Sequence, residues 1–331
     1  MEIRILSRED VAGLVDMPGA IDAMAQAFEA LSTGAAEAPL RTALASEAGV
    51  HLFMPAQVPD ADALGEKVVS VNHGNVARGL PAIHAVVLML DDATGRARAL
   101  MDGTWLTALR TGAAGGLAAE HLSRPESRVV ALFGAGVQAR TQVEAVRCVR
   151  PITDVRIVSR TQDSAEALAG EVTERAAAEG FALRAVAMTD AAGAVRDADI
   201  IITATNSPTP VFPGDAVKAG VHITAVGSYT PRMQEVDAEL IARSRVIVDQ
   251  IQAVLAEGGD LAAPIAEGRF GPEIIAGELG EVVAGLIPGR TSEEEITYFK
   301  SVGNAVQDVV LGRRVLEAAE ARGVGTLVRL G

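Results

Sequence analysis

A glycine-rich turn between an apolar run and a helical pattern constrains the fold of this chain more than any other feature. The segment RVVALFGAGVQARTQVEAV, residues 128–146, places Gly134, Gly136 and Ala139 at that turn, with Val137 and Gln138 between them. Glycines permit a tight turn and close approach of the backbone to a pyrophosphate, and the helix N-terminus supplies amide donors. The spacing G-x-G-x-x-A in a strand–turn–helix context therefore predicts a dinucleotide site. The alternative is a turn of the same fold that binds no cofactor.

The sequence after Pro125 has the rhythm of a parallel sheet. Short β-branched runs alternate there with helical segments rich in alanine and glutamate. The runs are RVVALF, VRIVS, ALRAV, DIIITAT, VHITAVG and RVIVD. This alternation is typical of βαβ units, so it predicts an α/β, doubly wound parallel sheet of Rossmann type.

The first third of the chain follows a different pattern. A helix is expected between Asp16 and Gly34, followed by strands at 66–71, 82–90 and 97–101 and a second helix that ends near Ser123. Short turns join these strands, which favours an antiparallel or mixed sheet. A long amphipathic helix is expected at 303–322. With 331 residues the chain is long enough for two domains.

Composition excludes several classes of function. The net charge of −14 argues against a general nucleic-acid binder, because such proteins present clustered lysine and arginine. No apolar run reaches the length of a membrane helix, and the N-terminus MEIRILSRED does not resemble a signal peptide. We expect a soluble, cytoplasmic protein that binds neither membranes nor nucleic acid. Cys148 is the single cysteine, which excludes an internal disulfide and a cysteine-based zinc site, and it is expected to pack in a helix. No metal site is expected.

The end of the second strand of the parallel sheet bears on cofactor choice. NAD-preferring sites place an acid there for the ribose hydroxyls, whereas this chain has Ser159, Arg160 and Thr161. A guanidinium flanked by hydroxyls suits the 2′-phosphate of NADP, so NADPH is the expected cofactor and NADH a possible one. The alternative is that Arg160 is a solvated residue at a helix start.

Three cations in the first part of the chain are candidates for an anion site: Arg41, Lys67 and Arg110. Arg110 lies in a helical segment among alanine, leucine and glycine, where a buried cation needs an anionic partner. A substrate carboxylate is one such partner. An ion pair with Glu66, Asp102 or Glu120 is the other interpretation, and the residues alone leave both open.

These residues and their surroundings resemble the ornithine cyclodeaminase/mu-crystallin family. The resemblance spans nearly the whole chain and is carried by MPA (54–56), Lys67, GLP (79–81), ALMDGTWLTALRTGAA (99–114), GAGVQA (134–139), TATNS (203–207), AVGSYTPRMQEVD (225–237) and SVGNAVQD (301–308). It implies a homodimer and a substrate-binding and dimerisation domain of α+β type, residues 1–120 with 305–331. A dinucleotide-binding Rossmann domain, residues 121–304, is inserted into it.

The resemblance also implies roles for individual residues. Arg41, Lys67 and Arg110 match the family's substrate-carboxylate cluster, and Lys67 is a candidate proton donor. Thr205 and Asn206 would end a strand at the cofactor, with Val302 and Gly303 beside the nicotinamide. The expected reaction is NAD(P)H-dependent reduction of a small cyclic imino acid, Δ1-pyrroline-2-carboxylate or Δ1-piperideine-2-carboxylate.

One residue departs from the cyclodeaminase pattern. Ornithine cyclodeaminases carry an aspartate at the position of Ser228. This chain has a serine there, as mu-crystallin-type ketimine reductases do, and a serine cannot supply the same carboxylate. Ala82 stands where members often have threonine. Three alternatives stay open: an ornithine cyclodeaminase, an amino-acid dehydrogenase such as alanine dehydrogenase, and a non-catalytic NADPH-binding crystallin-like protein.

Overall fold

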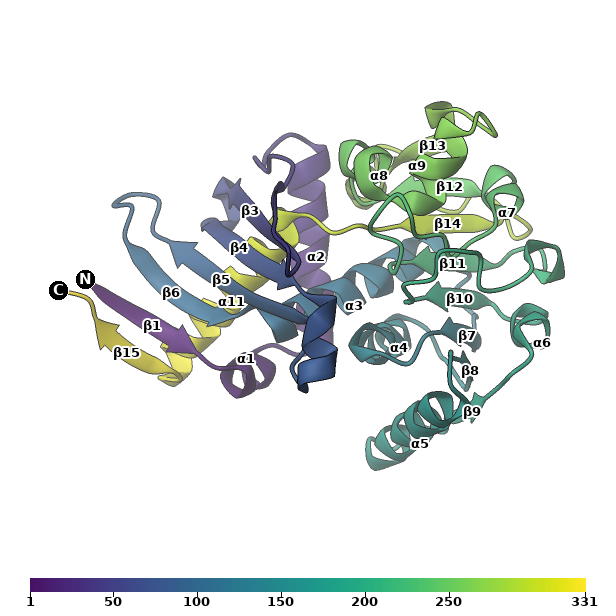
Figure 1. Ribbon diagram of the computed structural model, residues 1–331, viewed down its shortest axis with the longest axis horizontal. Helices are drawn as coiled ribbons and strands as arrows, with labels where there is room; N and C mark the ends of the chain where they lie inside the picture. Colours follow the sequence, from purple (N-terminus) through teal and green to yellow (C-terminus); the bar gives the residue numbers. More distant parts are fainter. The chain divides into compact units, whose positions relative to one another are not determined.

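The computed structural model describes residues 1–331, apart from the side chains of His73 and Val76. The chain forms two compact units, and the first consists of residues 1–110 with 303–331. The second consists of residues 111–302. Figure 1 labels most of the helices and strands of both units. No helix of the described residues is long and apolar enough to cross a bilayer.

The second unit is built on a sheet of eight parallel strands, as the alternating pattern predicts. In sheet order they are β13 (Ile275–Glu278), β12 (Arg245–Val248), β14 (Thr297–Lys300), β11 (His222–Ala225), β10 (Ile200–Thr203), β7 (Val129–Phe133), β8 (Asp154–Val158) and β9 (Arg184–Ala187). The chain runs outward from β7 through β8 to β9 and then returns through β10 and β11, which is the reversal of a doubly wound fold. This confirms the predicted fold class.

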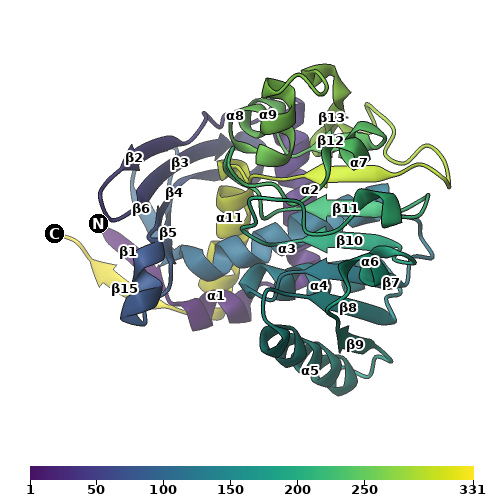
Figure 2. The ribbon, with the colours of Figure 1, turned by 45° about the vertical axis from the view of Figure 1, so that its right-hand side comes forward.

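Helices connect these strands along the chain. They are α4 (Val137–Val149), α5 (Gln162–Ala178), α6 (Ala191–Val195), α7 (Ala238–Ala242), α8 (Ile251–Glu257), α9 (Gly259–Ala266) and α10 (Leu279–Val283), with 3-10 turns η3 (Gly214–Ala216) and η4 (Pro272–Ile274). Figure 2 shows these helices and strands in a second view. Cys148 is exposed on α4, so the expectation that it packs was wrong.

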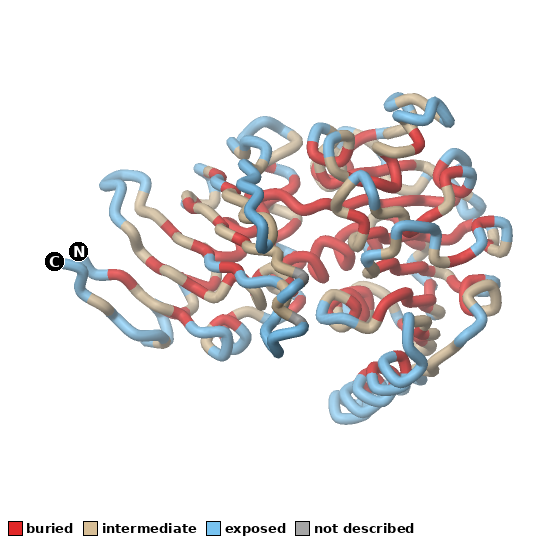
Figure 3. Tube along the Cα trace, in the orientation of Figure 1, coloured by how far each residue is buried: buried red, intermediate tan, exposed pale blue. Residues whose placement is uncertain are grey.

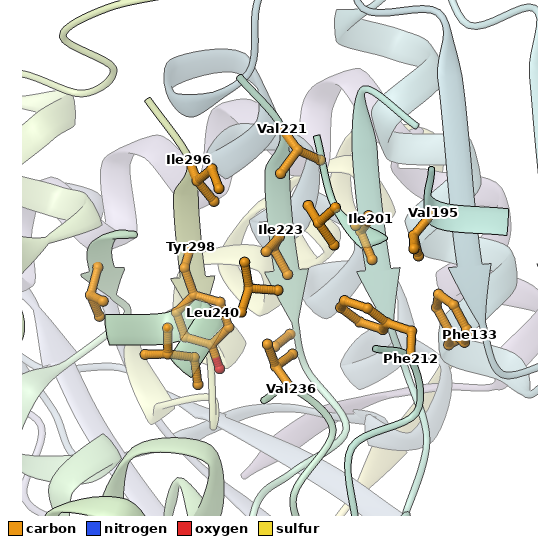
Figure 4. Packing of buried hydrophobic residues seen from close by; sticks show 14 of the residues in the cluster. Phe133, Val195, Ile201, Phe212, Val221, Ile223, Val236, Leu240, Ile296 and Tyr298 are labelled. Carbon is orange, nitrogen blue, oxygen red and sulfur yellow. The ribbon is translucent and has the colours of Figure 1, made fainter. Parts of the chain in front are cut away.

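Buried apolar side chains hold the sheet and its helices together. The strand β10 reads Ile-Ile-Ile-Thr and is buried throughout, because layers cover both faces of a parallel sheet. Figure 4 shows one of the resulting cores, in which the rings of Phe133 and Phe212 lie with centroids 5.1 Å apart. Ile201 and Ile223 of neighbouring strands pair in the same register and fill the centre of this core.

The first unit contains a mixed sheet of seven strands. In sheet order they are β15 (Thr326–Arg329), β1 (Glu2–Leu6), β6 (Ala97–Asp102), β5 (Ile83–Leu90), β4 (Ala63–Val71), β3 (Val50–Val58) and β2 (Thr42–Ala45). Only β1 and β6 pair in parallel, and the other neighbours are antiparallel. The expected strands at 66–71, 82–90 and 97–101 thus correspond to β4, β5 and β6.

Helices cover one face of this sheet. The helices of the unit are α1 (Arg8–Leu14), α2 (Met17–Ser32) and α11 (Ala305–Arg322), with 3-10 turns η1 (Pro59–Ala61) and η2 (His73–Arg78). Asp16 caps α2 by accepting from the Gly19 amide, as the start signal predicts. The helix α11 packs against β3, β4 and β5 and against α2. The helix α3 (Gly103–Leu122) begins in this unit and ends in the other.

Burial alternates along the central strands of this sheet, as Figure 3 shows. From residue 63 to 69 in β4 and from 85 to 89 in β5 every second residue is buried, and these residues include Lys67, Val69 and Val87. Side chains on a strand alternate between faces, so these residues point toward the helices. A long cation therefore shares the helix-covered face of the sheet with aliphatic residues.

Candidate functional site

The glycine turn after β7 has the form that a dinucleotide site requires. Gly134 has φ +109°, and a Cβ built on it would lie 2.5 Å from the Ala204 carbonyl oxygen, so only glycine fits there. Gly136 is the N-cap of α4 and no side chain caps that helix. A Cβ on Gly136 would meet nothing within 4 Å. Val137 is exposed and Gln138 half-buried beside this open N-terminus, whereas Ala139 is buried against the sheet. The turn therefore fits a pyrophosphate.

The end of β8 presents an exposed cation. Arg160 is exposed and makes no hydrogen bond or ion pair with any described residue. Thr161 is the N-cap of α5, where its hydroxyl accepts from the Ser164 amide and contacts the Ser164 hydroxyl at 2.6 Å. Ser159 is half-buried at the strand end. The arrangement leaves a guanidinium available to an anion next to a helix N-terminus.

A buried carboxylate ties the ends of β10 and β11 together. Glu235 is fully buried, and its oxygens accept from the Thr203 and Thr205 hydroxyls and from the Thr205, Gly227 and Ser228 amides at 2.6–3.0 Å. Burial and the neighbouring charge of Asp260 raise the pKa of Glu235, while Lys300 opposes them. Asn206 is exposed just beyond Thr205. Sequence reasoning missed Glu235, although it lies inside the family segment AVGSYTPRMQEVD.

The hydroxyl of Ser228 is occupied by the fold of the second unit. It donates to the Met233 carbonyl oxygen at 2.7 Å and accepts from the Asp260 amide at 3.2 Å, and the residue is fully buried. Asp260 in turn pairs with Lys300 at 3.0 Å, with both side chains buried. Ser228 is therefore surrounded by Glu235, Asp260 and their partners.

The segment after β14 is anchored by a second buried acid. Asp249 accepts from the Ser301 hydroxyl at 2.8 Å and from the Val302 amide at 2.9 Å. Its other oxygen accepts from the Gln250 amide. The backbone around Val302 is consequently fixed at the C-terminal end of the strand.

In the first unit, Lys67 and Arg110 share one carboxylate. Asp308 Oδ2 lies 2.6 Å from Lys67 Nζ, and Asp308 Oδ1 lies 3.1 Å from Arg110 Nε. Lys67 is 2% exposed, Arg110 6% and Asp308 0%. The interpretation of an ion pair was one of the two left open, and the partners it named, Glu66, Asp102 or Glu120, are wrong. The observed partner, Asp308, comes 198 residues after Arg110.

The first turn of α11 also orients Arg110. Gln307 Oε1 accepts from Arg110 Nη1 at 2.8 Å and from the Asn304 amide at 3.1 Å, so one side chain caps the helix and holds the guanidinium. Arg110 Nη2 makes no hydrogen bond with a described residue. A donor of a buried guanidinium is thereby left for a ligand.

Burial lowers the pKa of Lys67 to about 7. Desolvation of the ammonium is the largest cause, and the charges of Arg110 and Arg41 add to it. Asp308 opposes these effects through its charge and its hydrogen bond. A lysine with this pKa can hold or release a proton near neutral pH.

Arg41 joins the cluster through Gly303. Arg41 Nη2 donates to the Gly303 carbonyl oxygen at 3.1 Å. Gly303 has φ +78°, and a Cβ built on it would lie 2.6 Å from Arg110 Nη1. The structure thus brings all three predicted cations together, with Gly303 in contact with the same group. No cluster of histidine, cysteine, aspartate or glutamate with metal-site geometry occurs among the described residues.

Comparisons with known proteins show the family of this chain. Residues 1–323 match the model of the ornithine cyclodeaminase/mu-crystallin family. A Δ1-pyrroline-2-carboxylate reductase of Bacillus cereus is 40% identical over 97% of this chain and 98% of its own. The structure of the Thermococcus litoralis Δ1-pyrroline-2-carboxylate reductase in complex with NADH and L-proline superimposes with a TM-score of 0.93 at 38% identity, covering 98% of this chain and 99% of that one. An archaeal alanine dehydrogenase dimer with bound NAD gives a TM-score of 0.93 at 35% identity, with both chains fully covered.

Proposed function

Because this chain belongs to the ornithine cyclodeaminase/mu-crystallin family, we propose that it reduces a small cyclic imino acid with a nicotinamide cofactor. The leading substrate is Δ1-pyrroline-2-carboxylate, which such a reduction converts to proline. The six-membered Δ1-piperideine-2-carboxylate is the larger homologue. The relatives with the highest identity reported above are reductases of the five-membered ring, which supports that choice.

The observation that carries the proposal is the shared carboxylate of Lys67, Arg110 and Asp308. When Lys67 is protonated, these three buried side chains hold two positive charges and one negative charge, so the group is then net positive in a water-poor environment. A substrate carboxylate would neutralise it, and a buried guanidinium offers a fixed, planar donor set for that purpose. Arg41, held on the Gly303 carbonyl oxygen, adds a third cation.

We assign the cofactor to the second unit. The turn from Gly134 to Ala139 would hold the pyrophosphate, and Thr205, Asn206 and Val302 would line the site of the dinucleotide. Gly303, predicted to lie beside the nicotinamide, is proposed instead to shape the carboxylate cluster, because it contacts Arg41 and Arg110. The bound cofactor supplies a hydride to the imine carbon.

The chain's own residues supply binding, orientation and the proton. Arg110 and Arg41 would fix the carboxylate and thereby orient the C=N bond. Lys67 Nζ carries three N–H groups, of which Asp308 uses one among the described contacts. We propose that Lys67 gives a proton to the imine nitrogen as the carbon is reduced.

NADPH is proposed as the preferred cofactor and NADH as an alternative. The exposed, unpaired Arg160 beside Thr161 supports binding of a 2′-phosphate. The structures of the related reductase and alanine dehydrogenase contain NADH and NAD, which supports NADH as the alternative cofactor.

A homodimer is proposed for the first unit. The sheet face opposite the helices carries a row of apolar side chains in register, Phe53, Val68 and Val86, flanked by Leu44 and Leu88. Leu44 and Val86 are 60% and 42% exposed. Contiguous exposed apolar surface of this kind marks protein interfaces. The related alanine dehydrogenase is a dimer, which supports a second copy as the partner.

One assay separates this function from its rivals. Purified protein is incubated with NADPH or NADH and each of Δ1-pyrroline-2-carboxylate, Δ1-piperideine-2-carboxylate, pyruvate with ammonia, and ornithine with catalytic NAD. We expect cofactor oxidation stoichiometric with cyclic imine and negligible ammonia from ornithine. Efficient release of ammonia and proline from ornithine would instead identify a cyclodeaminase. Rapid amination of pyruvate would identify an alanine dehydrogenase, and cofactor binding without turnover would identify a crystallin-like protein.

A further inference from the structure

Asp308 occupies a position that neither carboxylate binding nor hydride transfer explains. Its two oxygens are divided between two cations, Oδ2 on Lys67 and Oδ1 on Arg110, and it is fully buried in the first turn of α11. An acid beside a carboxylate-binding cluster reduces the attraction of that cluster for an anionic substrate. A residue that weakens substrate binding needs another role.

The geometry points to that role. We propose that Asp308 is a positioning residue that holds the Lys67 amino group as the proton donor to the imine nitrogen, an inference that rests on the proposed reductase function. Arg110 is fixed on the other oxygen and on Gln307, so the carboxylate is held from two sides. The ammonium of Lys67 is consequently aimed by a group that is itself immobilised.

The charges around Lys67 explain why such a partner is required. Arg110 from α3 and Arg41 from the segment before β2 both face it and disfavour its charged form, as does burial. Among the described residues, Asp308 from α11 is the charge that opposes them most strongly. Without Asp308 the pKa of Lys67 would fall further, and the amine would be unprotonated at neutral pH.

The proton and electron balance is complete with these groups. The hydride carries both electrons to the imine carbon, and one N–H bond of Lys67 breaks while an N–H bond of the product forms. Lys67 is left as a neutral amine hydrogen-bonded to Asp308 and regains its proton from water. In the reverse reaction, the oxidation of proline, the neutral amine of Lys67 accepts the proton from the substrate nitrogen.

The first test is the pH dependence of kcat/KM for Δ1-pyrroline-2-carboxylate with Asp308→Asn. Reduction needs protonated Lys67 and therefore declines as pH rises through its pKa, whereas proline oxidation rises over the same range. Asp308→Asn should move the fall of the reduction rate and the rise of the oxidation rate, the two limbs of the pH profile, to lower pH by at least about one unit. At pH 8 the variant should therefore lose about tenfold more of its reduction rate than the wild type does. Asp308→Glu should return both limbs of the pH profile to their wild-type pH. Titration of the substrate nitrogen is common to all variants and cannot produce the difference.

Asp62→Asn is the matched control, because Asp62 is an exposed acid of the same unit that pairs with Arg98 and Arg313. It should leave both limbs unchanged. Loss of kcat in Asp308→Asn with the limbs at their wild-type position would overturn the proposal, since a purely structural role lowers activity without moving the pKa.

The second test uses the wild-type protein and does not require turnover. Pyrrole-2-carboxylate, whose ring nitrogen does not titrate near neutral pH, is bound calorimetrically at pH 8 in buffers of different ionisation enthalpy. Entry of a carboxylate favours protonated Lys67, so the protein should take up protons, and Lys67→Met should take up none. Ligand binding without proton uptake between pH 7 and 9 would overturn the inference. Failure of the reductase function appears separately, as binding and proton uptake without oxidation of NADH on any cyclic imine.

Discussion

Gly303 and Arg110 lie so close that a Cβ on residue 303 would approach Arg110 Nη1 to 2.6 Å. The backbone of Gly303 has φ +78°, and its carbonyl oxygen accepts from Arg41. One glycine therefore sets the distance between two of the proposed substrate-binding cations.

Gly303→Ala should displace Arg110 and lower kcat/KM for the cyclic imine by about 100-fold, because small displacements of orienting groups are costly. The left-handed backbone adds a stability loss of about 1–2 kcal/mol. Gly323→Ala is the control, since Gly323 has φ +66° with open space around a Cβ. Both variants should unfold at lower temperature, and only Gly303→Ala should lose activity. Equal activities would remove Gly303 from the site.

Arg160→Ala should weaken NADPH binding by about 10- to 150-fold while changing NADH little, since a charge-assisted contact contributes about 1.5–3 kcal/mol. The measurement is a fluorescence titration with each cofactor. Arg196→Ala removes another exposed arginine of the same unit and should affect neither. Parallel losses for NADPH and NADH would exclude contact with the 2′-phosphate.

Ser228→Asp should destabilise the protein rather than convert it into a cyclodeaminase. The new carboxylate would be buried beside Glu235 and Asp260, where Lys300 is already paired. The expected loss is of the order of 3 kcal/mol. Ser228→Ala loses only the two hydroxyl contacts and should cost about 1–2 kcal/mol. Thermal unfolding measures both losses. An aspartate variant as stable as the wild type would show that the loop relaxes and that the position can face a ligand.

Leu44→Glu should weaken the proposed dimer, because it places a charge on the exposed apolar face of the seven-stranded sheet. Sedimentation analysis should then show monomer at concentrations where the wild type is dimeric. Leu286→Glu is the control, since Leu286 is equally exposed, at 63%, but belongs to the second unit. A wild-type protein that sediments as a monomer would remove the proposed role of this face.

Sequence patterns predicted the elements whose signals are local. The strand β10 is an uninterrupted β-branched run, β7 and β11 are short runs that contain β-branched residues, and the cap of α2 is readable at Asp16. The strand β14 was missed, because Thr-Tyr-Phe-Lys is short and ends in a lysine, yet all of it is buried. Its Lys300 is tolerated there because Asp260 neutralises it. The strand β3 was missed because Pro55 interrupts it.

The same limit applies to the site. Lys67 and Arg110 were identifiable as cations in apolar surroundings, but their shared partner was sought among nearby acids. Asp308 is distant in sequence and becomes a neighbour only when α11 packs on β4. The one sequence signal for Asp308 was the family segment SVGNAVQD, which contains this residue but does not indicate what it contacts.

The placement of Gln307 and Asp308 on the last helix also has a consequence during synthesis. Arg110 leaves the ribosome 198 residues before the carboxylate that pairs with it, and Lys67 leaves earlier still. The whole second unit, residues 111–302, is translated in that interval. A nascent chain can therefore complete its glycine turn while the cationic group is still exposed to water and protonated. The group is enclosed only after α11 has been made and has packed on β4.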